Sequence, residues 1–112
     1  MQQDDGILQG TLDMLVLQTL ILGPAHGHAI AHAIERRSDQ LLQVEHGSLY
    51  PALYRLEARG WIASFAGTSE NNRKARYYRI TRAGRQRVKR EARDWQETTA
   101  ILARFLPQEE PS

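Results

Sequence analysis

The sequence predicts a mainly α-helical protein with one small β-hairpin, organised as a single domain followed by a long C-terminal helix. Three observations predict this fold class. First, apolar residues have helical spacing in the segments between Gly10 and Gly60. Second, residues 61–66 and 75–80 favour paired strands. Third, helical spacing returns between Thr81 and Pro107. A chain of 112 residues has room for one domain.

The composition is typical of a globular protein. Hydrophobic residues make up 41% of the chain and charged residues 25%. No apolar run reaches the roughly 18 residues of a membrane span, and residues 1–5 are polar and acidic, unlike a secretory signal. The chain contains no cysteine, which excludes disulfide bonds, thiolate metal sites and cysteine nucleophiles. We therefore expect a cytoplasmic protein that does not enter a membrane.

Two helices are predicted in the first third of the chain. Residues 10–22 carry a wide apolar stripe, which the turn at Gly23 ends. A second, shorter helix begins at Gly27 and places Ile30 and Ile34 one turn apart on its buried face. Its last turn is basic, as helix C-termini often are.

A third helix is predicted from about Gly47 to Gly60. Its buried face holds leucines at spacing i, i+4 and i+7, and a proline is tolerated in its first turn because the first amides of a helix have no intrahelical partner. The opposite face is free to contact another molecule. The buried leucines are Leu49, Leu53 and Leu56, and the exposed face carries Gly47, Tyr50, Pro51 and Tyr54, with Ser48 and Arg55 on its flank.

A β-hairpin and a last helix follow. Residues 61–66 and 75–80 are rich in strand-forming side chains, and the turn residues 67–73 separate them. Thr81 can cap a helix that runs to about Leu106, which at about 1.5 Å per residue is close to 40 Å long. The order helix, helix, helix, hairpin is typical of a winged helix, in which the second and third helices form a helix-turn-helix and the hairpin is the wing.

The last helix carries a seam of apolar residues at alternating spacings of four and three, a heptad-like pattern that favours a partner helix. Such a helix is too long to pack wholly on so small a domain, although part of the seam can cover the chain's own first helix. We predict a winged-helix DNA-binding domain over residues 10–81, a dimerisation helix over residues 82–106, and disordered tails over residues 1–7 and 107–112. The seam residues are Val88, Ala92, Trp95, Thr99, Leu102 and Leu106, with Ile101 and Phe105 widening it.

Positive charge is concentrated between Arg73 and Arg93. This segment holds ten of the 15 basic residues and one acid, Glu91, although the net charge of the whole chain is only +2. Such a run favours a nucleic-acid partner, while the alternative is an ordinary solvated surface.

Three separated motifs occur in the order of one known family. The central motif comprises residues 47–57 (GSLYPALYRLE) and the Gly60-Trp61-Ile62 that follows them. The first motif precedes it and comprises residues 15–17, 22–24 and 27–30. The third motif follows it at residues 76–84. Together they resemble the PadR family of transcriptional regulators over residues 10–106. The single C-terminal helix is similar to the PadR subgroup with a short C-terminal region. His28 departs from the tyrosine common in the family, which puts no assigned role in doubt.

The resemblance implies a DNA-binding repressor that dimerises through its first and last helices. Leu12 and Leu15 therefore join the seam residues as predicted interface. It also implies that an aromatic residue of the last helix lines a pocket between the subunits. Trp95 is the candidate, and a flat aromatic effector could stack there; equally, Trp95 could pack as dimer core.

The third helix and the hairpin tip hold the predicted contacts to double-stranded DNA. Hydroxyl groups and Arg55 on the third helix can reach phosphates or base edges, while the alternative is that its tyrosines pack locally. The basic tip can enter the minor groove or hold phosphates. Arg76 and Arg79 project to opposite faces of their strand, and we assign Arg76 to the DNA side. The predicted contacts are Ser48, Tyr50, Pro51, Tyr54, Arg55, Asn72, Arg73, Lys74 and Arg76, beside Asn71.

Neither catalysis nor metal binding is predicted. His28 and His32 share one helix face near His26 and Glu35, but a third ordered ligand is missing, so we expect surface histidines. The chain lacks a thiol, a phosphate-binding glycine loop and paired carboxylates on a rigid frame, so we expect no enzyme and no cofactor. The remaining alternative is a winged-helix protein-interaction module without specific DNA binding.

Overall fold

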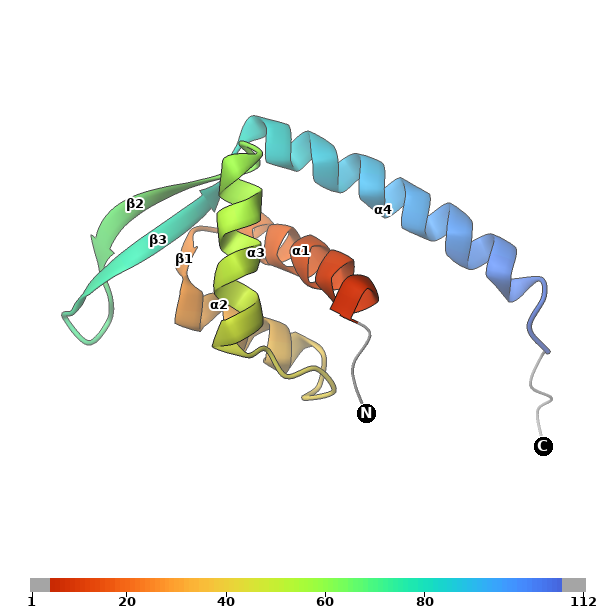
Figure 1. Cartoon of the computed structure of the whole chain (residues 1–112), viewed down its shortest axis with the longest axis horizontal. Helices are drawn as coiled ribbons and strands as arrows, with labels where there is room; N and C mark the ends of the chain where they lie inside the picture. Colours follow the sequence, from red (N-terminus) through yellow and green to blue (C-terminus); the bar gives the residue numbers. More distant parts are fainter. Residues whose placement is uncertain (1–4, 108–112) are drawn as a thin grey trace.

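The computed structural model describes residues 5–107 of the chain, with side chains from residue 10 onward. This part forms a helical body from which a hairpin and a long helix extend in opposite directions (Figure 1). Mainly α-helical architecture with a small sheet confirms the predicted fold class. The elements are α1 (Asp5–Ile21), β1 (Ala25–His26), α2 (Gly27–Arg37), α3 (His46–Ala58), β2 (Ile62–Thr68), β3 (Lys74–Ile80) and α4 (Arg82–Ala103).

Two helix boundaries differ from the sequence prediction. Residues 5–7, predicted to lie in a disordered tail, belong to α1. α4 ends at Ala103 instead of Leu106, and the backbone N–H of Leu106 donates to the carbonyl of Leu102 in a final turn. Residues 1–4 and 108–112 of the predicted tails lie outside the described residues.

The sheet contains a strand that the sequence analysis missed. β1 pairs antiparallel with β3, with Ala25 opposite Tyr78 and His26 opposite Tyr77, and β3 pairs with β2 to give the order β1-β3-β2. A strand of two residues shows no alternation that a sequence pattern could reveal. Because β1 leads directly into α2, it ties the base of the wing to the start of the helix-turn-helix.

The core lies between α1, α2, α3 and the base of the wing. The three leucines predicted on the buried face of α3 are almost completely inaccessible, which confirms that part of the helix pattern. Burial raises the pKa of the Tyr78 phenol above its ordinary value, and the Arg76 guanidinium partly opposes this. The core comprises Val16, Leu17, Leu20, Ile30, Ala31, Ile34, Leu49, Leu53, Leu56, Ile62, Tyr78, Ile80 and Val88.

One junction joins the end of α3, the wing and the start of α4. The Thr81 hydroxyl donates to the Gly60 carbonyl at 2.7 Å and accepts from the Gly84 backbone N–H at 3.1 Å, so it caps α4 as predicted. The Thr81 backbone N–H also donates to the Trp61 carbonyl at 3.0 Å. The Arg87 guanidinium packs over the Trp61 ring at 4.8 Å from its centroid. These contacts set the direction in which α4 leaves the body.

Candidate nucleic-acid interface

The outward face of α3 carries the aromatic residues that the sequence analysis placed there. Tyr54 is 75% exposed and Tyr50 is 45% exposed, and Ser48 and Pro51 are exposed beside them. Leucines on the opposite face anchor the helix in the core, so the face is held in a fixed orientation. It offers phenol hydroxyls, a serine hydroxyl and flat apolar surface to a partner.

Tyr50 is positioned by α2 as well as by α3. A Cβ atom at Gly27 would lie 2.6 Å from the Tyr50 hydroxyl oxygen, so the tyrosine occupies space that only a glycine leaves open. The ring also meets the His46 ring edge-on at 5.6 Å between centroids. Tyr50 is therefore less free than Tyr54 to change its direction.

Arg55, predicted on the flank of α3, forms an ion pair with a residue of α1. Its Nη2 donates to Asp13 Oδ1 of α1 at 2.7 Å, and both side chains are largely shielded from solvent. The partners are separated by 42 positions in the chain, so no local pattern indicates the pair. Arg55 therefore connects α3 to α1 in the free protein, and its contact with DNA stays a prediction.

The wing tip is an ordered turn with exposed basic and amide side chains. The Ser69 backbone N–H donates to the Arg73 carbonyl at 2.8 Å, and the Asn72 N–H donates to the Ser69 carbonyl at 2.9 Å. Asn72 adopts φ 60°, a left-handed conformation that asparagine tolerates better than most residues. Asn71, Asn72, Arg73 and Lys74 are all exposed at this tip.

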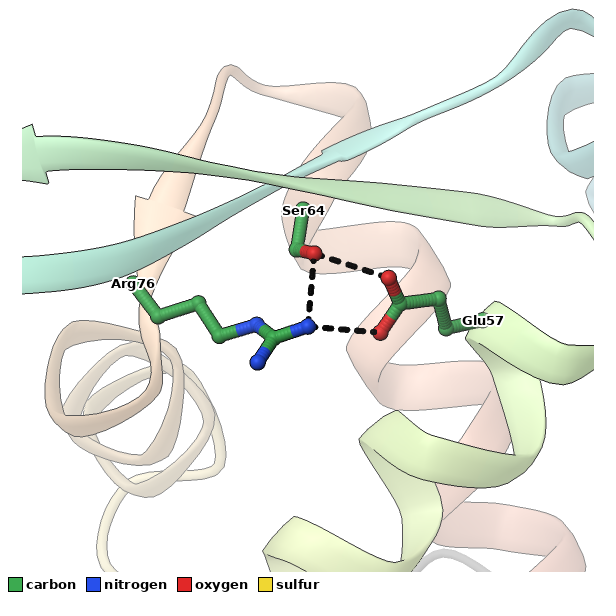
Figure 2. Close-up of polar contacts among 3 residues, drawn as sticks. All are labelled: Glu57, Ser64 and Arg76. Atoms are coloured by element: carbon green, nitrogen blue, oxygen red, sulfur yellow. Dashed lines mark hydrogen bonds and ion pairs between the residues drawn. The ribbon is translucent and has the colours of Figure 1, made fainter.

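A polar triad connects the wing to α3 (Figure 2). The Ser64 hydroxyl of β2 donates to Glu57 Oε2 at 2.7 Å, and Arg76 Nη2 of β3 donates to Ser64 Oγ at 3.0 Å. The same Arg76 nitrogen lies 3.6 Å from Glu57 Oε1. Arg76 therefore points toward α3, and its charge is partly balanced by the carboxylate. Arg76 was predicted as a site residue from the sequence, whereas Glu57 and Ser64 were not. Only the hairpin register and the packing of the wing bring the three side chains together.

The basic run between Arg73 and Arg93 does not form one continuous surface. It is divided between the wing and the first half of α4, which extend in opposite directions (Figure 1). Arg87 is held by Trp61 and forms an ion pair with Glu91, one turn further along α4. Within this run, Arg73 and Lys74 lie exposed at the wing tip.

The outer part of α4 and the turn that follows it leave apolar side chains in solvent. Trp95 is 51% exposed and Leu106 is 64% exposed, and Ile101, Leu102 and Phe105 are exposed with them. Thr99 is exposed and Ala92 is half-buried on the same helix. The described single chain leaves this face uncovered, because α4 runs past the end of the helical body (Figure 1).

Val88 departs from its predicted place on the dimer seam. It is 4% exposed and belongs to the domain's own core, because the first turns of α4 still lie against the body. Leu12 and Leu15 of α1 are partly buried against the same core, so each offers only part of its side chain to a partner. The exposed seam accordingly begins beyond Val88.

The four histidines of the chain lie near one another at the starts of α2 and α3. His26 caps α2, since its Nδ1 accepts from the Ala29 backbone N–H at 3.2 Å. Within residues 5–107, no group of three or more histidine or carboxylate side chains has the geometry of a metal site.

Comparison with known proteins decides the family. The model of the PadR-like family of transcriptional regulators matches residues 16–90, which include the helix-turn-helix, the wing and the first nine residues of α4. The chain belongs to the PadR-like family. Because the family consists of transcriptional regulators, this membership agrees with the prediction of a protein that is not an enzyme.

Solved structures share the fold of this PadR-like regulator over most of its length. A transcriptional regulator from Clostridium thermocellum has 31% identity and a TM-score of 0.82, and the match covers 91% of this chain and 99% of that chain. A PadR family regulator from Clostridium difficile has 24% identity and a TM-score of 0.75, and the match covers 88% of this chain and 100% of that chain.

A sequence relative covers a similar length. An uncharacterised protein of Lysinibacillus sphaericus is 28% identical over 100 residues, which are 89% of this chain and 92% of that protein.

The described helices of the PadR-like regulator include none that could cross a membrane.

Proposed function

We propose that this PadR-like regulator represses transcription by binding a specific double-stranded DNA site as a homodimer. The observation that carries the proposal is the exposed face of α3, where Tyr54 stands free beside the more constrained Tyr50. An exposed helix of this kind fits the major groove, and a basic hairpin tip beside it can hold the phosphate backbone. Ser48, Tyr50, Pro51 and Tyr54 would meet the groove, and Asn72, Arg73 and Lys74 would meet the backbone, with Arg76 supporting the wing through α3.

The homodimer would form through the exposed part of α4. Heptad-like spacing on one side of α4 relates Ala92, Trp95, Thr99 and Leu102, and Leu106 continues the spacing in the turn that follows the helix. An isolated chain would keep this apolar stripe in water, which is unfavourable in proportion to its area. A two-fold pairing of the helices removes the stripe from water and presents two copies of α3 to a two-fold symmetric DNA site.

Tyr54→Ala and Lys74→Ala are expected to weaken DNA binding in two different ways. Tyr54→Ala should reduce the preference for a selected duplex over a random one by about 1–3 kcal/mol, since base contacts specify. Lys74→Ala should weaken binding to every duplex and lower the salt slope by about 1.8 per dimer, from one lost phosphate contact in each subunit. The duplex is first selected from a random library with the full chain, and anisotropy titrations at two salt concentrations then measure both quantities.

Matched variants separate the assigned roles from general damage. Tyr54→Phe keeps the ring and removes only the hydroxyl, so it shows which part of the side chain reads the site. Lys89→Ala removes an exposed lysine from α4, outside the wing, and should leave the salt slope unchanged. A Tyr54→Ala protein with parental selectivity would refute the role of α3. If the parent binds no duplex at all, the protein-interaction module becomes the better proposal.

The proposal also includes repression of transcription and an aromatic effector that binds between the two subunits at Trp95. Trp95 lies about midway along α4 and is half-exposed in the single chain, so a two-fold partner helix would bring a second indole toward it. A flat aromatic compound could stack between the two rings and shift the spacing of the α3 helices, to the extent that it prefers one dimer geometry. A selected site placed over a promoter should reduce transcription when the regulator is present.

Planar aromatic compounds are expected to quench Trp95 emission. The chain has two tryptophans, so a Trp61→Phe variant reports on Trp95 alone. Titration with acridine in the absence of DNA should quench this variant in a saturable manner, and Trp95→Ala should abolish the binding. Binding that persists unchanged in Trp95→Ala would place the pocket elsewhere.

A further inference from the structure

Aromatic and imidazole rings form a continuous chain across one surface of the domain. His28 contacts His32 at 5.3 Å and His46 at 6.4 Å between ring centroids, which joins the first turn of α2 to the first turn of α3. His26 lies 6.4 Å from His28 and meets Tyr77 of the wing at 5.4 Å. All four histidines of the chain are thus on this surface, which we call the histidine surface (His26, His28, His32 and His46).

The histidine surface lies between the two sets of proposed DNA contacts. His46, Tyr50 and Tyr54 are spaced four residues apart on α3, so they share one face of that helix. The His46 ring touches Tyr50 at the end of this stripe. On the other side, His26 reaches Tyr77, which stacks on Phe65 of β2. A duplex that contacted both α3 and the wing would therefore pass close to these imidazoles.

The described residues include no ion pair between an acid and one of these rings. The titratable groups that contact the rings are Tyr77 from β3 and Tyr50 from α3. Of the carboxylates near them in the chain, Glu35 uses Oε2 to accept from the Val44 backbone N–H at 2.8 Å, and Glu45 adjoins His46 in sequence with its side chain exposed. His28, His32 and His46 are exposed as well.

We propose that the histidine surface is a third contact of the DNA backbone, one that strengthens as the pH falls. The inference rests on the proposed DNA-binding function and adds a pH dependence to it. Histidine changes charge near physiological pH, and an imidazolium donates from both ring nitrogens, whereas a neutral ring donates from one. DNA binding then takes up protons, and each new cation–phosphate contact releases counterions.

The test compares DNA binding by the full chain at pH 6.0 and pH 8.0. The probe is a fluorescein-labelled duplex of random sequence, since phosphate contacts do not depend on the bases. We expect affinity to be on the order of tenfold higher at the lower pH, and the salt slope to be steeper by about 0.9 for each additional phosphate that the imidazolium rings neutralise. A purely structural role for the histidines would leave the salt slope equal at the two pH values.

Two variants assign the effect to these side chains. One variant combines His28→Gln, His32→Gln and His46→Gln, and it should lose most of the pH dependence. His26 is retained because its Nδ1 accepts a hydrogen bond that caps α2. His32→Arg places a permanent charge on the same exposed site, and should raise affinity at pH 8.0 while reducing the pH dependence. It also keeps the test available if the triple variant fails to fold, which circular dichroism would reveal.

The outcomes separate this inference from the proposed function. If the parent binds DNA with the same affinity and salt slope at both pH values, the histidine surface does not contact the backbone. Undiminished pH dependence in the triple variant, or an unaltered response in His32→Arg, would likewise overturn the inference and leave DNA binding intact. Absence of binding at either pH would refute the proposed function, and this inference with it.

Discussion

Replacing Gly84 with alanine is expected to lower the free energy of unfolding by about 3 kcal/mol, the upper end for an overpacked site. A Cβ atom at Gly84 would lie 2.1 Å from the Trp61 carbonyl oxygen and 2.7 Å from Ile80 Cγ1. The first obstacle is backbone, which cannot rotate away as the end of a flexible side chain could. The start of α4 must therefore move, and the hydrogen bond from the Gly84 N–H to Thr81 weakens with it.

Urea denaturation followed by circular dichroism, at one fixed protein concentration, measures this effect. Gly47→Ala is the matched control, because Gly47 is also helical and a Cβ there has nothing within 4 Å. The control should be neutral or stabilising by up to about 1 kcal/mol, since alanine favours helix over glycine. Equal unfolding midpoints for the two variants would show that the junction between Trp61 and α4 is not tightly packed.

Replacing Leu102 with glutamate is expected to convert a dimer into monomers. The side chain is exposed on the apolar seam of α4, and two-fold symmetry would place two such charges in the same interface. Burying an unpaired carboxylate is strongly unfavourable, so the dissociation constant should rise at least about a hundredfold. Light scattering at micromolar concentration should then report the 12.8 kDa chain mass for the variant and twice that for the parent.

Ala100→Glu introduces the same charge on the opposite side of α4 and serves as the control. At about 100° per residue, positions 100 and 102 face directions about 160° apart. The control should remain dimeric and keep the DNA affinity of the parent. A monomeric parent would refute dimerisation through α4, and a dimeric Leu102→Glu protein would move the interface to another face.

Local patterns predicted the elements whose packing depends on near neighbours in the chain. The spacing of Leu49, Leu53 and Leu56 identified the buried side of α3, and the same geometry left Tyr54 outside. Thr81 was found as the cap of α4 because a capping residue acts on amides within one turn. The two-residue strand β1 was not predicted, since its pairing with β3 leaves no periodic signal in the sequence.

The sequence by itself therefore determined the helix faces, the hairpin and the motifs that mark a PadR-like regulator, because each depends on residues a few positions apart. Only the tertiary structure decided which polar groups remain free. The packing of α1 on α3 brings Arg55 to Asp13, and the register of the wing strands brings Arg76 to Ser64. The starts of α2 and α3 lie close together, so His28 lies near His46. Val88 and Leu102 both belong to the predicted heptad-like seam, yet Val88 is buried in the core and Leu102 is exposed. The difference arises because α4 extends beyond the helical body on which its first turns pack. Charge pairing and burial are set by distances in space, which residue spacing encodes only within a single helix or hairpin.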